Sequence, residues 1–130
     1  MTETHRALSR ADVLLVEDDP DLREAMAWLF EDEGIPLRLA NGGEQALAQV
    51  AAAMPALVLL DLTMPGLQPA DLVRRLRGDP RTARIPIVVL SAARDVAVRA
   101  RALGADGAVA KPYDVDDLVR VVRKYLPAGL

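Results

Sequence analysis

The 130-residue sequence has no cysteine, a single histidine and few aromatic residues, which make up 3 % of the chain. The lack of cysteine excludes disulfides and thiolate metal ligands. No apolar run approaches the roughly 20 residues of a membrane-spanning helix, and the polar start "MTETHRALSR" lacks the apolar region of a signal peptide. The net charge of −3 gives no electrostatic basis for nucleic-acid binding. We therefore expect a cytoplasmic domain without direct contacts to membranes or nucleic acids.

Hydrophobic residues make up 52 % of the chain, which suffices for one sizeable core. We expect a single domain over residues 1–130, with a core of about 12–126 between a short polar N-terminal extension and a frayed C-terminus. Short apolar runs alternate five times with amphipathic segments, a pattern typical of an α/β protein with a doubly wound parallel sheet. The predicted strands are Val13–Val16, Leu37–Ala40, Leu57–Leu60, Ile87–Leu90 and Ala108–Ala110. The predicted helices are Pro20–Glu33, Gly43–Ala53, Ala70–Arg77, Asp95–Leu103 and Val115–Leu126.

Several helix boundaries carry recognisable signals. Asp19 before Pro20 predicts an N-cap followed by proline in the first turn. Asn41 with Glu44 three residues later resembles a capping box. Asp114 is placed to cap the last helix.

Other side chains receive structural interpretations. Gly34 and Gly104 are predicted to end the helices that precede them. Trp28 and Phe30 are expected to pack within or beside the first helix. A basic run is interpreted as a solvated helix face, as most such runs are: Arg74, Arg75, Arg77, Arg81 and Arg84.

The segment "LVLLDLTMPG" ends a fully apolar strand with a carboxylate, Asp61. A strand without polar alternation is typical of the buried centre of a parallel sheet. An unpaired carboxylate in that environment is costly. Asp61 therefore either forms part of a turn or belongs to a site at the end of the strand.

Polar residues follow other predicted strands as well, and the carboxyl ends of parallel strands meet at one edge of the sheet, where such sheets bind ligands. The residues that we expect at this edge are Glu17, Asp18, Asp19, Asp61, Thr63, Ser91, Ala92, Lys111 and Pro112. Clustered carboxylates need a cation, and hard oxygen ligands suit Mg²⁺. Carboxylates also form acyl phosphates, and a lysine, a hydroxyl and loop N–H groups can bind the phosphoryl oxygens. The pattern predicts phosphoryl chemistry at Asp61.

Four motifs resemble, in sequence and order, those of the receiver domain of two-component response regulators: "LLVEDDPDLRE", "LVLLDLTMPG", "IVVLSA" and "GADGAVAKPY". The resemblance covers about Asp12 to Leu126. It implies a flavodoxin-like (βα)5 fold with five parallel strands in the order 2-1-3-4-5. It also implies that a sensor histidine kinase or a histidine phosphotransfer protein phosphorylates Asp61, and that the resulting switch controls a downstream protein or a linked output domain.

The resemblance assigns roles by position. The residues that it assigns to Mg²⁺, for which Mn²⁺ could substitute, are Glu17, Asp18, Asp61 and, through its backbone carbonyl, Thr63. The residues that it assigns to the phosphoryl group are the switch hydroxyl Ser91 and Lys111, and we expect the N–H of Ala92 to donate to the same group. The Lys111–Pro112 bond is expected to be cis, and Asp19 is interpreted as a helix cap.

The sequence also departs from the family pattern. Ala108 stands where the family usually has an aromatic residue that moves during switching, so we expect the helix at 95–103 and the loop before it to carry more of the change. Gln68 and Pro69 replace the usual polar residue and glycine after the "MPG" turn, so the next helix should begin differently.

Three alternatives to a receiver are disfavoured by the sequence. A haloacid dehalogenase-type phosphatase also uses an aspartate after an apolar strand, but it normally has a second aspartate two residues later, where this chain has Thr63. We therefore expect no turnover of external substrates and only slow self-dephosphorylation. A receiver that works without phosphorylation is disfavoured because the site residues are intact. A nucleotide-binding Rossmann domain is disfavoured because no GxGxxG follows the first strand.

Overall fold

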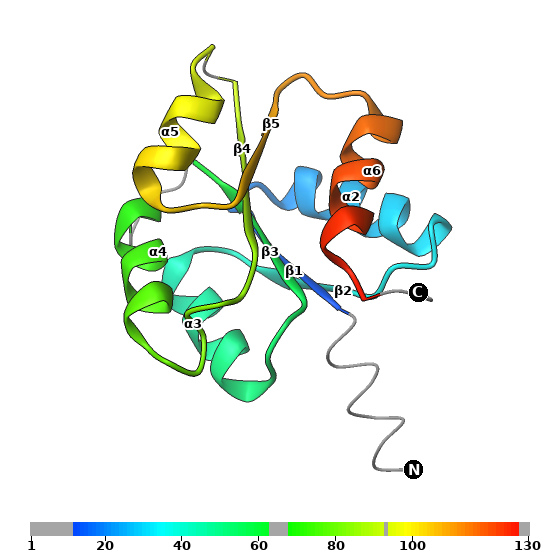
Figure 1. Cartoon of the computed structure of the whole chain (residues 1–130). Coiled ribbons are helices and arrows are strands. Elements are labelled where there is room, and N and C mark those ends of the chain that lie inside the picture. The colour runs from blue at the N-terminus through cyan, green and yellow to red at the C-terminus, as the bar shows by residue number, and fades with distance from the viewer. Residues whose placement is uncertain (1–11, 63–67, 93, 128–130) are drawn as a thin grey trace.

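Five parallel strands form the sheet at the centre of the protein (Figure 1). The computed structural model describes residues 12–62, 68–92 and 94–127. The strands are β1 (Val13–Val16), β2 (Leu37–Ala40), β3 (Leu57–Asp61), β4 (Ile87–Ser91) and β5 (Gly107–Ala110). They pair in the order β2-β1-β3-β4-β5, all in parallel, so the predicted fold class and strand order are confirmed.

Helices cover both faces of the sheet, as expected for a doubly wound fold. They are α2 (Pro20–Asp32), α3 (Gly43–Ala52), α4 (Pro69–Gly78), α5 (Val96–Leu103) and α6 (Val115–Tyr125). Figure 1 shows α3, α4 and α5 on one side of the sheet and α2 with α6 on the other. The strands and helices begin and end within one residue of the predicted bounds.

The sheet separates two hydrophobic layers. Successive side chains of a strand point to opposite faces. Val58 and Leu60 of β3 accordingly pack with α3, α4 and α5, whereas Leu57 and Leu59 pack with α2 and α6. All four side chains are almost completely inaccessible to solvent. This burial on both faces explains why the strand has no alternating polar residues.

Two of the predicted caps fix the helices beside the carboxyl edge of the sheet. The Asp19 carboxylate accepts hydrogen bonds from the N–H groups of Asp21 (2.9 Å) and Leu22 (3.5 Å), which confirms it as the N-cap of α2. The Asp114 carboxylate accepts from the N–H of Asp116 at 2.8 Å and caps α6. Gly104 ends α5 with a φ of 90°, a left-handed conformation that glycine adopts without strain.

Three local predictions were wrong. The proposed capping box at Asn41 does not form, because α3 begins with Gly42 as its cap residue and Gln45 Oε1 accepts from the Asn41 N–H at 2.6 Å. Trp28 was expected to pack within or beside the first helix, but its residue is 68 % exposed, whereas Phe30 is fully buried. Arg77 is not part of a solvated face, because its guanidinium donates to the carbonyls of Gly104, Ala83 and Ile85 and pairs with Asp106.

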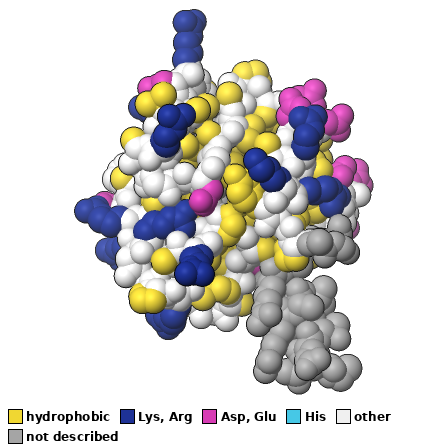
Figure 2. All heavy atoms as spheres, in the orientation of Figure 1, with side chains coloured by type: hydrophobic (Ala, Val, Ile, Leu, Met, Phe, Trp, Pro, Cys, Tyr) yellow, Lys and Arg dark blue, Asp and Glu magenta, His cyan; other side chains and the backbone are white. Residues whose placement is uncertain are grey.

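Charge is distributed unevenly over the chain. Residues 68–106 contain eight arginines and four aspartates, whereas residues 12–62 contain eleven acidic residues and two arginines. On the face shown in Figure 2, Lys and Arg side chains gather mainly on the side of α4 and α5. The acidic excess therefore belongs to the part of the chain that supplies β1, α2 and β3.

Candidate functional site

Asp61 is the last residue of β3 and lies at the carboxyl edge of the sheet. It is only 1 % exposed, and Lys111 Nζ lies 2.9 Å from its Oδ2. Lys111 follows β5, so the ion pair joins two segments that are 50 residues apart in the sequence. A buried carboxylate is costly without a partner, and the ammonium group supplies one. Asp61 is therefore part of an assembled site and not merely a turn residue.

Glu17 lies beside Asp61, one residue beyond the end of β1. It is 4 % exposed, and its N–H donates to the carbonyl of Ala40 at 2.9 Å. Burial, followed by the hydrogen bond and the charge of Asp61, raises the pKa of Glu17 to about 8. Two carboxyl groups thus share a site in which they cannot both ionise cheaply unless a cation joins them.

The neighbouring residues of the same connection are more accessible. Asp18 is half-buried and Asp19 is exposed. The Asp19 N–H donates to Glu17 Oε1 at 3.2 Å, while its carboxylate caps α2. The sequence interpretation of Asp19 as a structural residue therefore agrees with its position.

A backbone hydrogen bond connects Lys111 to Ser91. Ser91 is the last residue of β4 and is buried, and its carbonyl accepts a hydrogen bond from the Lys111 N–H at 2.8 Å. Burial alone would lower the pKa of Lys111, but the hydrogen bond and charge of Asp61, with the charge of Glu17, outweigh it and raise the pKa. The lysine therefore stays charged throughout the neutral pH range.

Pro112 and Ala92 directly follow Lys111 and Ser91 in the chain. The Lys111–Pro112 peptide bond is cis. Ala92 is exposed. Thr63, the fourth predicted metal ligand, lies outside the described residues.

The donor atoms available here fit a hard divalent cation. Among residues 12–62, 68–92 and 94–127, no three Asp, Glu, His or Cys side chains lie close enough together to hold a metal by themselves. Mg²⁺ in proteins, however, is usually held by one or two carboxylates and keeps several waters. The buried Glu17–Asp61 pair meets that requirement, so the carboxylates fit a magnesium ion without a complete protein cage.

A cavity of about 260 Å³ adjoins the site and was not predicted from the sequence. Its walls combine Glu17 and Lys111 with apolar residues, among them Leu22, Met26 and Tyr113. The Tyr113 hydroxyl donates to Met26 Sδ at 3.4 Å across the layer between α2 and the segment after β5. In the sequence, Tyr113 lies only two residues after Lys111. Leu22 and Met26 belong to a helix, and their approach to Tyr113 depends on the fold.

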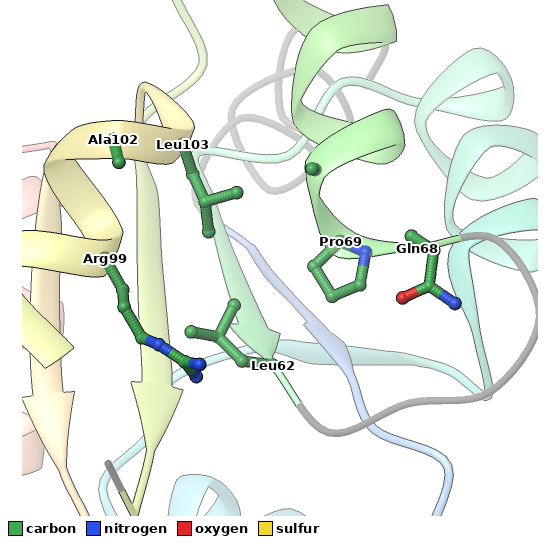
Figure 3. Close-up of a pocket in the computed structure, with 7 residues that line it drawn as sticks. Leu62, Gln68, Pro69, Arg99, Ala102 and Leu103 are labelled. Carbon is green, nitrogen blue, oxygen red and sulfur yellow. The ribbon is translucent and has the colours of Figure 1, made fainter.

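A second hollow, of about 340 Å³, opens between α4 and α5 (Figure 3). Leu62, Pro69 and Leu103 surround it, and Arg99 lies at its side. No carboxylate, hydroxyl or imidazole group lines this hollow among the residues that the structure describes. It therefore lacks the groups for phosphoryl chemistry, which remain at the carboxyl edge of the sheet.

Comparisons with known proteins agree with this geometry. The family model of the response regulator receiver domain matches residues 13–123. The DNA-binding response regulator MtrA of Mycolicibacterium smegmatis is 40 % identical over 119 residues, which are 90 % of this chain and 51 % of MtrA. The sporulation initiation phosphotransferase F of Bacillus subtilis is 33 % identical over 88 % of this chain and 93 % of its own length. This chain thus spans about half the length of MtrA but nearly all of the phosphotransferase.

A solved structure shows the same fold. The receiver domain of the sensor histidine kinase PA1611 from Pseudomonas aeruginosa PAO1, which has a magnesium ion coordinated in its active-site cleft, superposes with a TM-score of 0.81 at 24 % identity, over 89 % of this chain and 97 % of that domain.

The chain belongs to the response regulator receiver domains. It is a module of two-component signalling that accepts a phosphoryl group and responds to it. The family is one of signalling receiver domains and not of classical enzymes. No helix in the described part of the chain is long and apolar enough to cross a membrane.

Proposed function

We propose that Asp61 is the residue that accepts the phosphoryl group. The observation that carries this proposal is the 2.9 Å contact between Lys111 Nζ and the buried Asp61 carboxylate at the end of β3. The ammonium group lies where phosphoryl oxygens would add negative charge, and a fixed charge at that point stabilises the transfer. The adjacent Ser91 and the N–H of Ala92 are proposed as further donors to the phosphoryl oxygens.

The donor is proposed to be a phosphohistidine on a sensor histidine kinase or a histidine phosphotransfer protein. An Asp61 carboxylate oxygen attacks phosphorus, the P–N bond to the imidazole breaks, and an acyl phosphate forms. The imidazole nitrogen leaves with the electron pair of that bond and takes up a proton from solvent. The phosphorylated domain then acts on a downstream protein or on a linked output domain.

Mg²⁺ is the proposed cofactor, and Mn²⁺ is expected to substitute because it accepts the same oxygen ligands. The residues that would hold it are Glu17, Asp18, Asp61 and the backbone carbonyl of Thr63. When bound, the ion offsets the negative charges of the carboxylates and of the incoming phosphoryl group. The proximity of two buried carboxyl groups supports this proposal: burial and the neighbouring Asp61 raise the pKa of Glu17, so a divalent cation bound between them would favour the ionised form of both.

The switch is proposed to begin at Lys111 and Ser91. Ala108 is half-buried and borders a hollow of about 200 Å³ together with Ala97 and Ala100 of α5. Because no large side chain moves at position 108, we expect α5 and the loop before it to carry most of the change. NMR spectra with and without beryllofluoride test this, and shifts confined to the site would contradict it.

A direct experiment tests the proposed phosphoacceptor. Wild-type protein and the Asp61→Asn variant are incubated with radiolabelled acetyl phosphate and MgCl₂, and the acid-labile radioactive phosphoryl group bound to each protein is quantified. We expect one phosphoryl group per wild-type chain and none on D61N, with Asp95→Asn as the matched control that retains the label. Labelling of D61N at the wild-type level would contradict the assignment.

The same proteins test the phosphatase alternative. Without a second aspartate two residues after Asp61, we expect slow self-dephosphorylation and no turnover of an aryl phosphate. Appreciable hydrolysis of the aryl phosphate that disappears in D61N would instead identify an enzyme.

A further inference from the structure

Two proposed metal ligands, Glu17 and Asp18, are adjacent residues of the connection between β1 and α2. The carbonyl oxygen of Glu17 belongs to the peptide group that joins them, and it accepts a hydrogen bond from Arg23 Nη1 at 2.9 Å. Because a peptide group is planar, its orientation helps to set the directions in which the two carboxylates leave the backbone. Arg23 therefore contacts the peptide group between the two proposed ligands.

The rest of this connection is also fixed by hydrogen bonds. The Glu17 N–H donates to Ala40 O at 2.9 Å, and Glu17 Oε1 accepts from the Asp19 N–H at 3.2 Å. The backbone N–H of Arg23 donates to Asp19 O at 3.0 Å, which places the arginine one turn into α2. The guanidinium group thus reaches back from the helix to the residue that follows the strand.

Arg23 is half-buried beside a group of carboxylates, yet none of the ion pairs among the described residues includes it. Its side-chain bond is made to a neutral carbonyl, so it does not occupy the oxygens of Glu17 or Asp18. Arg38, the other arginine of residues 12–62, lies near the amino ends of the strands and pairs with Asp12 at 2.6 Å. Arg23 is thus the one basic side chain that this acidic stretch places at the site.

We propose that Arg23 is a positioning residue for the metal site: it fixes the Glu17–Asp18 peptide group and so orients both carboxylates for Mg²⁺. The inference rests on the proposed metal site. The positive charge of Arg23 acts in the opposite sense, because it repels a divalent cation, but salt screens that repulsion more than it weakens a partly buried hydrogen bond. A measurement at high salt therefore separates positioning from repulsion.

The test compares Arg23→Met, which removes the bond, with Arg23→Lys, which keeps one cationic donor. MgCl₂ is titrated into ¹⁵N-labelled protein in 1 M KCl, where the Debye length is about 3 Å, and the amide signals of Glu17 and Asp18 are followed. We expect R23M to bind Mg²⁺ about tenfold more weakly than wild type, as is usual for residues that orient metal ligands. R23K should stay within about threefold, because the contact is a single bond and not a bidentate one. Arg74→Met on α4 is the matched control and should bind like wild type.

Urea unfolding without Mg²⁺ identifies conditions in which every variant is folded, and Arg23→Gln replaces R23M if the methionine variant does not fold. A merely structural role would lower the unfolding midpoint and leave the Mg²⁺ affinity of the folded protein unchanged. Equal affinities of R23M and wild type would therefore overturn the inference while leaving the metal site intact. R23K as weak as R23M would also count against it. A wild-type protein that shows no Mg²⁺ response would instead refute the proposed metal site itself.

Discussion

Replacing Glu17 by glutamine is expected to stabilise the metal-free protein at neutral and alkaline pH. Burial, followed by the hydrogen bond and charge of Asp61, raises the pKa of Glu17 from 4.5 to about 8 in the folded protein. The folded state therefore keeps a proton that the unfolded chain has already released, so this group makes the protein less stable as the pH rises from 4.5 through 8. Glutamine does not ionise, and its amide can donate a hydrogen bond to the Asp61 carboxylate.

The size of the effect follows from the two pKa values. A pKa of 4.5 in the unfolded chain and about 8 in the folded protein means that ionisation of Glu17 lowers the free energy of unfolding by at most about 5 kcal/mol well above pH 8. About 3 kcal/mol of this loss has already occurred at pH 7. Glu17 is only 4 % exposed, so solvent screens little of it. Relaxation of the Glu17–Asp61 pair reduces the figure, and we expect E17Q to be about 2 to 4 kcal/mol more stable than wild type at pH 8.5. At pH 5 the difference should fall below about 1 kcal/mol.

Urea unfolding in EDTA at pH 5, 7 and 8.5 measures these free energies. Glu24→Gln, at an exposed glutamate of α2, is the matched control and should show no such pH-dependent gain. Saturating Mg²⁺ should stabilise the wild type more than E17Q, because a ligand that binds only the folded state adds its binding free energy. The reasoning is refuted if E17Q unfolds at the same or a lower urea concentration than wild type at pH 8.5 in EDTA.

Three further substitutions test the packing, each by urea unfolding at pH 7. Arg38→Met leaves the buried Asp12 without its cation and removes hydrogen bonds to the end of α3. We therefore expect the free energy of unfolding to fall by about 3 kcal/mol, and a fall of less than about 1 kcal/mol would contradict the pairing. Gly107→Ala places a methyl group 2.9 Å from the Tyr125 hydroxyl, so we expect the free energy of unfolding to fall by about 1 to 2 kcal/mol. Adding Tyr125→Phe to the same chain should restore part of this loss, and no recovery would exclude the clash. Trp28→Ala should cost no more than about 0.5 kcal/mol, because the residue is 68 % exposed, and a loss above 1 kcal/mol would mean that the indole is buried in solution.

The fold was predictable because its signals are local or periodic. Uninterrupted apolar runs such as Leu57–Leu60 identify strands buried on both faces, and caps such as Asp19 and Asp114 mark where helices begin. Parallel topology then brings Asp61 and Lys111 to one edge, which the 2.9 Å contact confirms. These inferences need only the chain direction and the order of the elements.

The errors occurred where the outcome depends on tertiary packing. A tryptophan in an amphipathic helix suggests burial, but the layer beside α2 is already filled by Met26 and Phe30, and Trp28 points elsewhere. Arg77 was indistinguishable in sequence from its solvated neighbours, since its carbonyl partners come from loops that only the fold brings near. The bond from Arg23 to Glu17 was likewise missed, because its geometry depends on the turn between β1 and α2.

The division of the interior by the sheet has a consequence for how such a protein can change. Buried side chains beneath α3, α4 and α5 form one hydrophobic cluster and those beneath α2 and α6 form another, and substitutions that share no contacts contribute nearly additively to stability. A lineage can therefore rebuild one layer to suit a new recipient of the signal while the other keeps the cavity wall beside Lys111 unaltered. The layer beneath α3, α4 and α5 and the layer beside the site can therefore change in sequence at different rates.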